Sequence, residues 1–263
     1  MFKKFIMLEW KAFLRSASFA KNLALKILMI FGAIYFAVMF VGLAFLAFYG
    51  LEEKFPDPLV VINKYLIYYF IFDLVFRLLL QKIPVMNIRP LLTLPIKSST
   101  IVNFSLGKTY LSFFNIVHGF LFVPFSIILL YEGYDVVSVL LWHLSITALL
   151  FINNFLNILL NNKDKLFILF FAVLIAFATA QYYELFDVTV YTGPFYHGLF
   201  TTKWMFIIPI IVLIGLYYTT FNYFKSNLYL DAGLASKHDI AKTENLTWLN
   251  QFGVMGTFLK NDI

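Results

Sequence analysis

Six long apolar stretches dominate the chain, and polar residues lie mainly in the segments between them. A helix that crosses a bilayer needs about 20 apolar residues, because the hydrocarbon core is about 30 Å thick and each residue rises about 1.5 Å. The first stretch is too long for a signal peptide and lacks a small-residue cleavage site, so we interpret it as an uncleaved span. The pattern therefore predicts an all-α, polytopic membrane protein with six transmembrane helices: Ile27–Tyr49, Val60–Leu80, Tyr110–Tyr131, Val136–Leu160, Leu166–Tyr183 and Trp204–Phe224.

Composition supports a protein that is dissolved in lipid. Hydrophobic residues make up 62% of the chain and charged residues only 13%, whereas soluble domains contain about 45–50% and about 25%. This composition argues against a soluble enzyme, a nucleic-acid-binding domain, a disordered regulator or a secreted disulfide scaffold. There is no cysteine, so disulfides and thiolate metal sites are excluded.

The basic residues predict the orientation of the spans. Six spans place both termini on one side, and all but three of the 20 Lys and Arg residues fall on that side; Lys54, Lys64 and Lys203 are the exceptions. Because basic residues stay in the cytoplasm, we expect both termini inside. The net charge of +6 is then an orientation signal that suits anionic lipid head groups, and it requires no nucleic acid.

The chain divides into three predicted regions. Residues 1–26 contain an amphipathic helix that is expected to lie in the membrane interface, with Lys4, Trp10, Lys11 and Arg15 at head-group depth; a plain cytoplasmic tail is the alternative. Residues 27–224 form the transmembrane domain, which includes a long cytoplasmic loop at about residues 81–108. Residues 225–263 form a polar cytoplasmic tail with a further amphipathic pattern.

The second span carries two opposite charges, Asp73 and Arg77, four residues apart and so on one helix face. A lone charge at this depth is costly, so Asp73 is expected to be paired or to face the protein interior. One interpretation is an ion pair that stabilises packing, with Arg77 extending to the interface. The other is a charged element that lines a substrate or ion path.

Spans three and four carry further polar side chains. Span three contains Asn115 and His118, and span four contains His143 and a row at four-residue spacing, Asn153, Asn157 and Asn161. Amides in lipid need partners, and hydrogen bonds between helices are the usual ones. We expect the row on span four to face Asp73, either as a structural seam or as a solute pathway.

Motifs for catalysis are missing from the sequence. The four histidines have no metal-ligand spacing, and neither a His-Glu-x-x-His nor a Gly-x-Ser-x-Gly motif occurs. Gly107-Lys108-Thr109 resembles the end of a phosphate-binding loop but lacks its first glycine, since position 102 is Val. We therefore expect no enzyme activity, metal or cofactor in this chain, and active transport would need a separate ATPase or an ion gradient.

The loop between spans two and three contains a short apolar block that prolines limit to about one helical turn. Such an element on the cytoplasmic face suits docking of a partner, through Arg89, Leu91, Leu92, Leu94, Ile96 and Lys97. A surface-lying or re-entrant connector without a partner is the alternative.

These features together resemble the permease subunits of ABC-2-type exporters, which share an interfacial first helix, six spans and a Leu-Pro-Ile or Leu-Pro-Val stretch in this loop. The loop here reads Leu91-Leu92-Thr93-Leu94-Pro95-Ile96-Lys97-Ser98-Ser99-Thr100. The opening Glu9-Trp10-Lys11-x-Phe13-x-Arg15 and the surroundings of Tyr68-Tyr69-Phe70 and Asp73 look like a bacterial family of uncharacterised ABC-permease-like membrane proteins.

The resemblance implies a permease that docks a separate ATPase through Arg89–Lys97 and moves a lipid-like or amphipathic substrate. A non-transporting membrane scaffold or assembly factor is the first alternative, and a lipid-modifying enzyme that uses Asp73, His118 or His143 is the second. The block Phe258-Leu259-x-x-Asp262-Ile263 repeats the pattern of Phe5-Ile6-x-x-Glu9-Trp10. We therefore expect a homodimer or a second six-helix repeat after Ile263, with chance similarity as the rival explanation.

Overall fold

The computed structural model describes residues 7, 11, 23–81, 95–161 and 164–227. These residues form helices and connecting segments without strands: α3 (Leu23–Glu52), α4 (Pro58–Leu80), α6 (Ser98–Tyr110), α7 (Phe113–Tyr131), α8 (Val136–Asn161), α9 (Asp164–Tyr182), α10 (Val188–Thr201) and α11 (Ile207–Asn227). The chain divides into two units, Met1–Lys225 and Ser226–Ile263. Almost all of the second unit lies outside the described residues, as does the predicted cytoplasmic tail.

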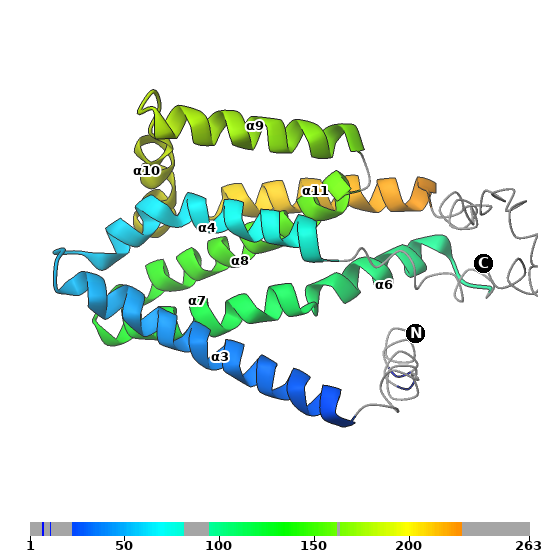
Figure 1. Cartoon of the computed structure of the whole chain (residues 1–263), viewed down its shortest axis with the longest axis horizontal. Helices are drawn as coiled ribbons and strands as arrows, with labels where there is room; N and C mark the ends of the chain where they lie inside the picture. Colours follow the sequence, from blue (N-terminus) through cyan, green and yellow to red (C-terminus); the bar gives the residue numbers. More distant parts are fainter. Residues whose placement is uncertain (1–6, 8–10, 12–22, 82–94, 162–163, 228–263) are drawn as a thin grey trace, which may run out of the picture. The chain divides into compact units, whose positions relative to one another are not determined.

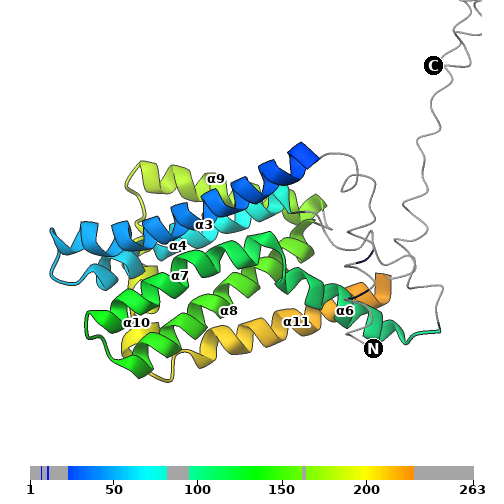
Figure 2. The same cartoon turned by 90° about the horizontal axis from the view of Figure 1, so that it is seen from below.

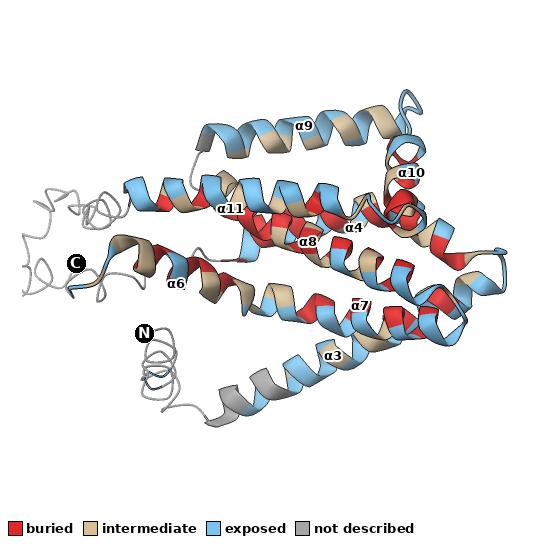
Figure 3. Ribbon diagram, turned by 180° about the vertical axis from the view of Figure 1, so that it is seen from behind, coloured by how far each residue is buried: buried red, intermediate tan, exposed pale blue. Residues whose placement is uncertain are grey.

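Six of these helices are long and apolar enough to cross a membrane: α3, α4, α7, α8, α9 and α11. They correspond to the six predicted spans, so the chain is an all-helical, multi-pass membrane protein. In Figure 1 they run roughly alongside one another within the first unit, and Figure 2 shows the same arrangement from below. Among these six spans, α4, α7 and α8 are the most buried, while no residue of the α9 span is buried (Figure 3).

Two helices differ from the predicted elements. The predicted third span began at Tyr110, but α6 ends there and α7 begins at Phe113 after a break at Leu111 and Ser112. The side-chain amide of Asn115 donates to the Thr109 carbonyl at this break, at 2.7 Å. The second difference is α10, which crosses the end of the bundle between α9 and α11 (Figure 1) and packs mainly against α4.

The loops at the α10 end of the unit carry most of the acidic residues that the structure describes, and we call this the acidic end: Glu53, Asp57, Glu132, Asp135, Glu184 and Asp187. Asp57 begins α4 by accepting from the Leu59 amide at 2.9 Å. Tyr134 donates to the same carboxylate at 2.9 Å and so joins two loops. Gly133 adopts φ +85 in the turn between α7 and α8, a conformation that favours glycine.

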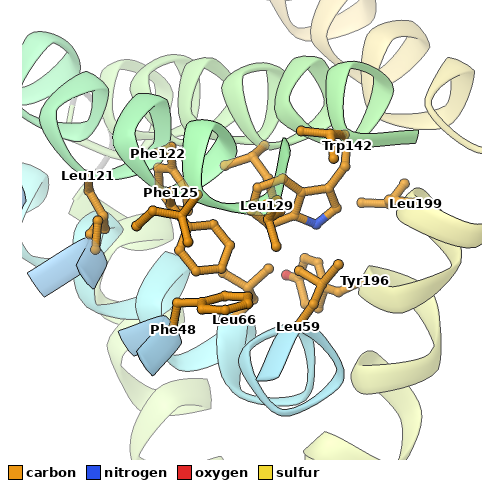
Figure 4. Packing of buried hydrophobic residues seen from close by; sticks show 14 of the residues in the cluster. Phe48, Leu59, Leu66, Leu121, Phe122, Phe125, Leu129, Trp142, Tyr196 and Leu199 are labelled. Atoms are coloured by element: carbon orange, nitrogen blue, oxygen red, sulfur yellow. The ribbon is translucent and has the colours of Figure 1, made fainter. Parts of the chain in front are cut away.

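An aromatic core fills the half of the bundle next to the acidic end. Trp142 of α8 is fully buried and packs against Phe122 and Phe125 of α7, with ring centroids 6.1 and 5.7 Å away. Phe70 of α4 stacks on Tyr196 of α10, and their ring centroids are 5.7 Å apart. Figure 4 shows these elements converging. Because lipid is as apolar as a leucine side chain, the core gains its stability from close packing rather than from removal of water.

Acidification is expected to lower the melting temperature through two helix-starting aspartates. Hydrogen bonds from the Thr189 side chain and backbone hold the pKa of the Asp187 carboxyl below its usual value, and bonds from Ser138 do the same for Asp135. A depressed folded-state pKa contributes stability above the unfolded value of about 3.9, and this contribution is lost as the pH falls through the folded value. Thermal melts between neutral and strongly acidic pH should show a smaller acid-induced loss in Asp187→Asn than in the control Glu184→Gln.

Candidate functional site

One face of α4 carries four polar side chains at four-residue spacing: Tyr69, Asp73, Arg77 and Gln81. Residues four apart on a helix lie one above another. Asp73, Arg77 and Gln81 are buried and Tyr69 is half-buried. The face therefore presents a polar ladder to the interior of the helix bundle.

Asp73 and Arg77 form an ion pair within α4. The Arg77 Nε donates to both carboxylate oxygens of Asp73, at 2.9 and 2.8 Å. Arg77 is 0% exposed, so the expectation that its side chain extends to the interface is wrong. The guanidinium remains inside because its Nη2 donates to the Phe114 carbonyl at 3.0 Å and its Nη1 donates to Gln81 Oε1 at 3.3 Å.

Two other helices complete the shell around Asp73. His118 of α7 places Nε2 at 2.8 Å from Asp73 Oδ1, and Asn153 of α8 donates to Oδ2 at 3.0 Å. Because the carboxylate only accepts, His118 Nε2 is the donor. In the neutral ring, its Nδ1 accepts from the Tyr69 hydroxyl. The Asn153 amide also donates to the Phe70 carbonyl at 2.8 Å.

The polar contacts continue from Gln81 to α6. Gln81 Nε2 donates to Asn154 Oδ1 at 3.0 Å, and the Asn154 amide donates to the Thr109 hydroxyl at 2.8 Å. Thr109 in turn donates to the Leu106 carbonyl at 2.7 Å. These contacts join four helices, and we call their members the Asp73 network: Tyr69, Asp73, Arg77, Gln81, Thr109, His118, Asn153 and Asn154.

The structure brings together only some of the polar residues that the sequence singled out. Asn161 donates weakly, at 3.4 Å, to the Leu78 carbonyl and to Asn157 Oδ1, so it continues the seam along α4 and α8. The buried Asn157 amide nitrogen has no partner. His143 lies apart, with Nδ1 at 2.8 Å from the Ser126 hydroxyl.

Four members of the network were missed in the sequence: Tyr69, Gln81, Thr109 and Asn154. Tyr69 and Gln81 carried a readable signal, because they extend the four-residue spacing of Asp73 and Arg77 in both directions. Asn154 carried only the general signal of an amide in a membrane span, and Thr109 carried none, because only the packing of α6 against α8 brings them together.

The predicted docking and interface residues lie mostly outside the described part of the chain: Arg89, Leu91, Leu92, Leu94, Lys4, Trp10 and Arg15. Ile96 is half-buried and Lys97 is exposed, and both directly precede α6. Met7 and Lys11 are helical and exposed, which does not establish the predicted interfacial helix.

The Asp73 network holds helices together through opposite charges and directed hydrogen bonds. The Asp73 carboxylate accepts from three side chains, so its charge is compensated inside the bundle. Within the described ranges, no group of three or more His, Asp or Glu side chains is placed to hold a metal ion. The arrangement is more typical of a structural contact that fixes α4 against its neighbouring helices than of an open polar channel.

Removal of the Tyr69 hydroxyl tests the contact between Tyr69 and His118 in the Asp73 network. Tyr69→Phe leaves His118 Nδ1 without its donor and is expected to lower the free energy of unfolding by about 1 kcal/mol, as for other hydrogen bonds between membrane helices. Tyr68→Phe is the matched control, because Tyr68 is exposed on another face of α4. Thermal melts in detergent should show a shift for Tyr69→Phe alone, and equal shifts would contradict the assignment.

A comparison with known families identifies this chain as a member of a family of unknown function (DUF5687), which matches residues 9–263. No curated protein and no solved structure gives a significant match. The family carries no activity that can be transferred to this chain, so a function has to be argued from the structure.

Proposed function

We propose that this chain is the transmembrane permease subunit of a bacterial ABC-type exporter, driven by a separate ATPase. In this proposal it lies in the inner membrane with both termini in the cytoplasm and the acidic end outside. Among the described residues, Lys97, Lys108, Lys165 and Lys225 belong to the end opposite the acidic loops. This distribution supports the orientation, because basic residues favour the cytoplasmic side.

The observation that carries the proposal is the connection between α6 and the Asp73 network. The predicted docking segment, residues 89–97, leads directly into α6 at Ser98. The far end of α6 is bonded through Thr109 and Asn154 to Gln81, and Gln81 accepts from Arg77. A displacement of α6 by an ATPase would therefore act on α4, α7 and α8 together. A passive anchor needs no such linkage.

The exposed faces of the unit suit a second set of helices and an amphipathic cargo. No residue of the α9 span is buried, and only 11% of the α3 span is. We propose that a homodimer or a second six-helix repeat encloses the transport path, as in transporters built from related halves. An aromatic, weakly charged lining would favour lipid-like cargo over small ions.

The test is stimulation of an ATPase. The chain is co-expressed with each candidate ATPase subunit that carries a Walker A motif, purified, and reconstituted into liposomes. We expect a stoichiometric complex, with hydrolysis faster than that of the ATPase alone. Replacement of residues 89–97 by a Gly/Ser sequence should abolish both complex and stimulation. The control replaces residues 183–186 of the acidic end and should change neither.

Three outcomes would contradict the proposal or its docking segment. If the loop variant still binds and stimulates the ATPase, the docking segment is wrong. If no encoded ATPase binds while another integral complex co-purifies stoichiometrically, the chain is a scaffold or assembly factor. Turnover of a lipid that Asp73→Asn abolishes without unfolding the protein would indicate the enzyme alternative.

A further inference from the structure

The outward face of α4 carries a stripe of large side chains along most of its length. Its exposed positions include Tyr65, Tyr68, Phe72, Phe76 and Leu79, and each is between 39% and 65% exposed. Neighbouring rings pack together: the ring centroids of Tyr65 and Tyr68 are 6.2 Å apart, and those of Phe72 and Phe76 are 4.4 Å apart. We call these five residues the α4 stripe. It lies on a different face of α4 from the buried Asp73 and Arg77.

The α4 stripe is poorly suited to another helix. Close packing of membrane helices favours small residues that let two backbones approach. Every position of the stripe is large, and four of the five are aromatic. Among the described residues, α9 has no extensive contact with α4. A flexible acyl chain can follow such a ridged surface because it needs no backbone approach.

A pair of opposite charges lies where the stripe reaches the acidic end. Lys64 is exposed directly before Tyr65, with its Nζ 5.6 Å from the centre of that ring. Asp187 is also exposed. Hydrogen bonds from Thr189 and Gln181 lower the pKa of the Asp187 carboxyl, and the charge of Lys64 lowers it further. Lys64 and Asp187 therefore lie within electrostatic range of each other. The close approach of α10 to α4, where a Cβ on Gly193 would lie 3.4 Å from the Lys64 Cα, holds this region together.

The spacing matches one leaflet of a bilayer. Half of the hydrocarbon core is about 15 Å thick. At about 1.5 Å per residue, the twelve steps along the helix from Lys64 to Phe76 span about 18 Å. A molecule with its head group at Lys64 and Asp187 would therefore lay its chain over Tyr65, Tyr68, Phe72 and Phe76.

We infer that the α4 stripe, together with Lys64 and Asp187, binds one phospholipid with a zwitterionic phosphate–ammonium head group. Lys64 contacts the phosphate, Asp187 contacts the ammonium, and an acyl chain lies along the aromatic side chains. A purely anionic head group fits less well because Asp187 would repel it. The inference does not depend on the permease proposal: the lipid is a ligand of this surface whether or not the protein transports it.

Native mass spectrometry of the full chain in detergent tests this inference. The probes are palmitoyl-oleoyl phosphatidylethanolamine and palmitoyl-oleoyl phosphatidylglycerol, titrated separately. We expect one phosphatidylethanolamine per chain, bound more tightly than phosphatidylglycerol. Lys64→Gln should weaken phosphatidylethanolamine about fivefold, the factor for a partly exposed ion pair. Asp187→Asn should weaken phosphatidylethanolamine but not phosphatidylglycerol.

Matched variants distinguish a specific lipid-binding site from nonspecific contact with the bilayer. Lys54→Gln alters another basic residue near the acidic end, and Phe45→Ala removes a similarly exposed ring from α3. Both should bind phosphatidylethanolamine as the unaltered protein does, whereas Phe72→Ala should bind it more weakly. Melting temperatures of all variants are recorded, so that loss of binding is compared only among folded proteins.

Three outcomes would overturn the inference: equal affinity for the two lipids, equal effects of Lys64→Gln and Lys54→Gln, or equal effects of Phe72→Ala and Phe45→Ala. A second copy on the stripe is tested directly, because the chain has no cysteine. Phe72→Cys should form no more disulfide-linked dimer than Phe120→Cys, which alters a similarly exposed ring on α7, and a strong excess would place protein rather than lipid there. The ATPase test above concerns the docking segment and not the α4 stripe. The permease proposal and the lipid inference can therefore each fail independently.

Discussion

Replacement of Arg77 by methionine is expected to lower the free energy of unfolding by about 3–5 kcal/mol, because it leaves a buried carboxylate without its cation. Asp73 is only 6% exposed. It would retain His118 and Asn153 as donors but lose its charge partner. The Phe114 carbonyl and Gln81 Oε1 would lose donors as well. Unfolding by SDS titration from mild detergent, followed by circular dichroism, measures the change.

The double variant Asp73→Asn with Arg77→Met provides the control. It removes both charges, and replacement of a whole buried ion pair by neutral groups is often close to neutral in stability. We therefore expect the double variant to be more stable than Arg77→Met alone. Lys225→Met, which removes an exposed cation at the end of α11, should have little effect. If the single and double variants are equally destabilised, the charge pair is not what Arg77 supplies.

Trp142→Ala is the second change with a large expected effect, again a loss of about 3–5 kcal/mol, which is typical when a buried Phe or Trp is cut to alanine. Trp142 is 0% exposed and joins α7 to α8 through Phe122 and Phe125. Its Nε1 also donates to Asn63 Oδ1 of α4 at 2.9 Å. The variant therefore opens a cavity and leaves a buried acceptor unpaired.

Trp204→Ala is the matched control, because Trp204 is 62% exposed. Thermal melts and SDS titration should show a large loss for Trp142→Ala and a small one for Trp204→Ala. Trp142→Phe should fall between them, since it keeps much of the ring contact but not the hydrogen bond. Equal losses for the two alanine variants would show that the aromatic core does not stabilise the bundle as described.

The six spans could be predicted from the sequence because each is a long apolar run that only a bilayer or a very large core could bury. Short helices at the ends of the bundle were not predictable in this way. The segment that forms α10 contains Gly193, Pro194 and Gly198, which disfavour helix. It is nevertheless helical, because Asp187 caps it and α4 covers one of its faces.

The candidate site was predictable only where its partners lie on one helix. The four-residue spacing of Asp73 and Arg77 predicts their ion pair, and the pair is present. The depth of Arg77 was misjudged because its other acceptors, Phe114 and Gln81, become visible only when α7 packs against α4. The contact between Asn153 and Asp73 was expected from a general need of amides for partners. Which faces of α4 and α8 meet at this contact, however, depends on how the helices pack in the bundle.

The internal pairing of Asp73 and Arg77 also has a consequence for the order in which the protein is made. Asn153, which completes the Asp73 shell, lies 80 residues further along the chain and emerges from the ribosome about 4–16 s after Asp73 at common translation rates. During that interval α4 carries its own counter-ion one turn away, so it can enter the membrane as a nearly neutral segment. The charge of Asp73 is thus paired within α4 before α7 and α8 are synthesised.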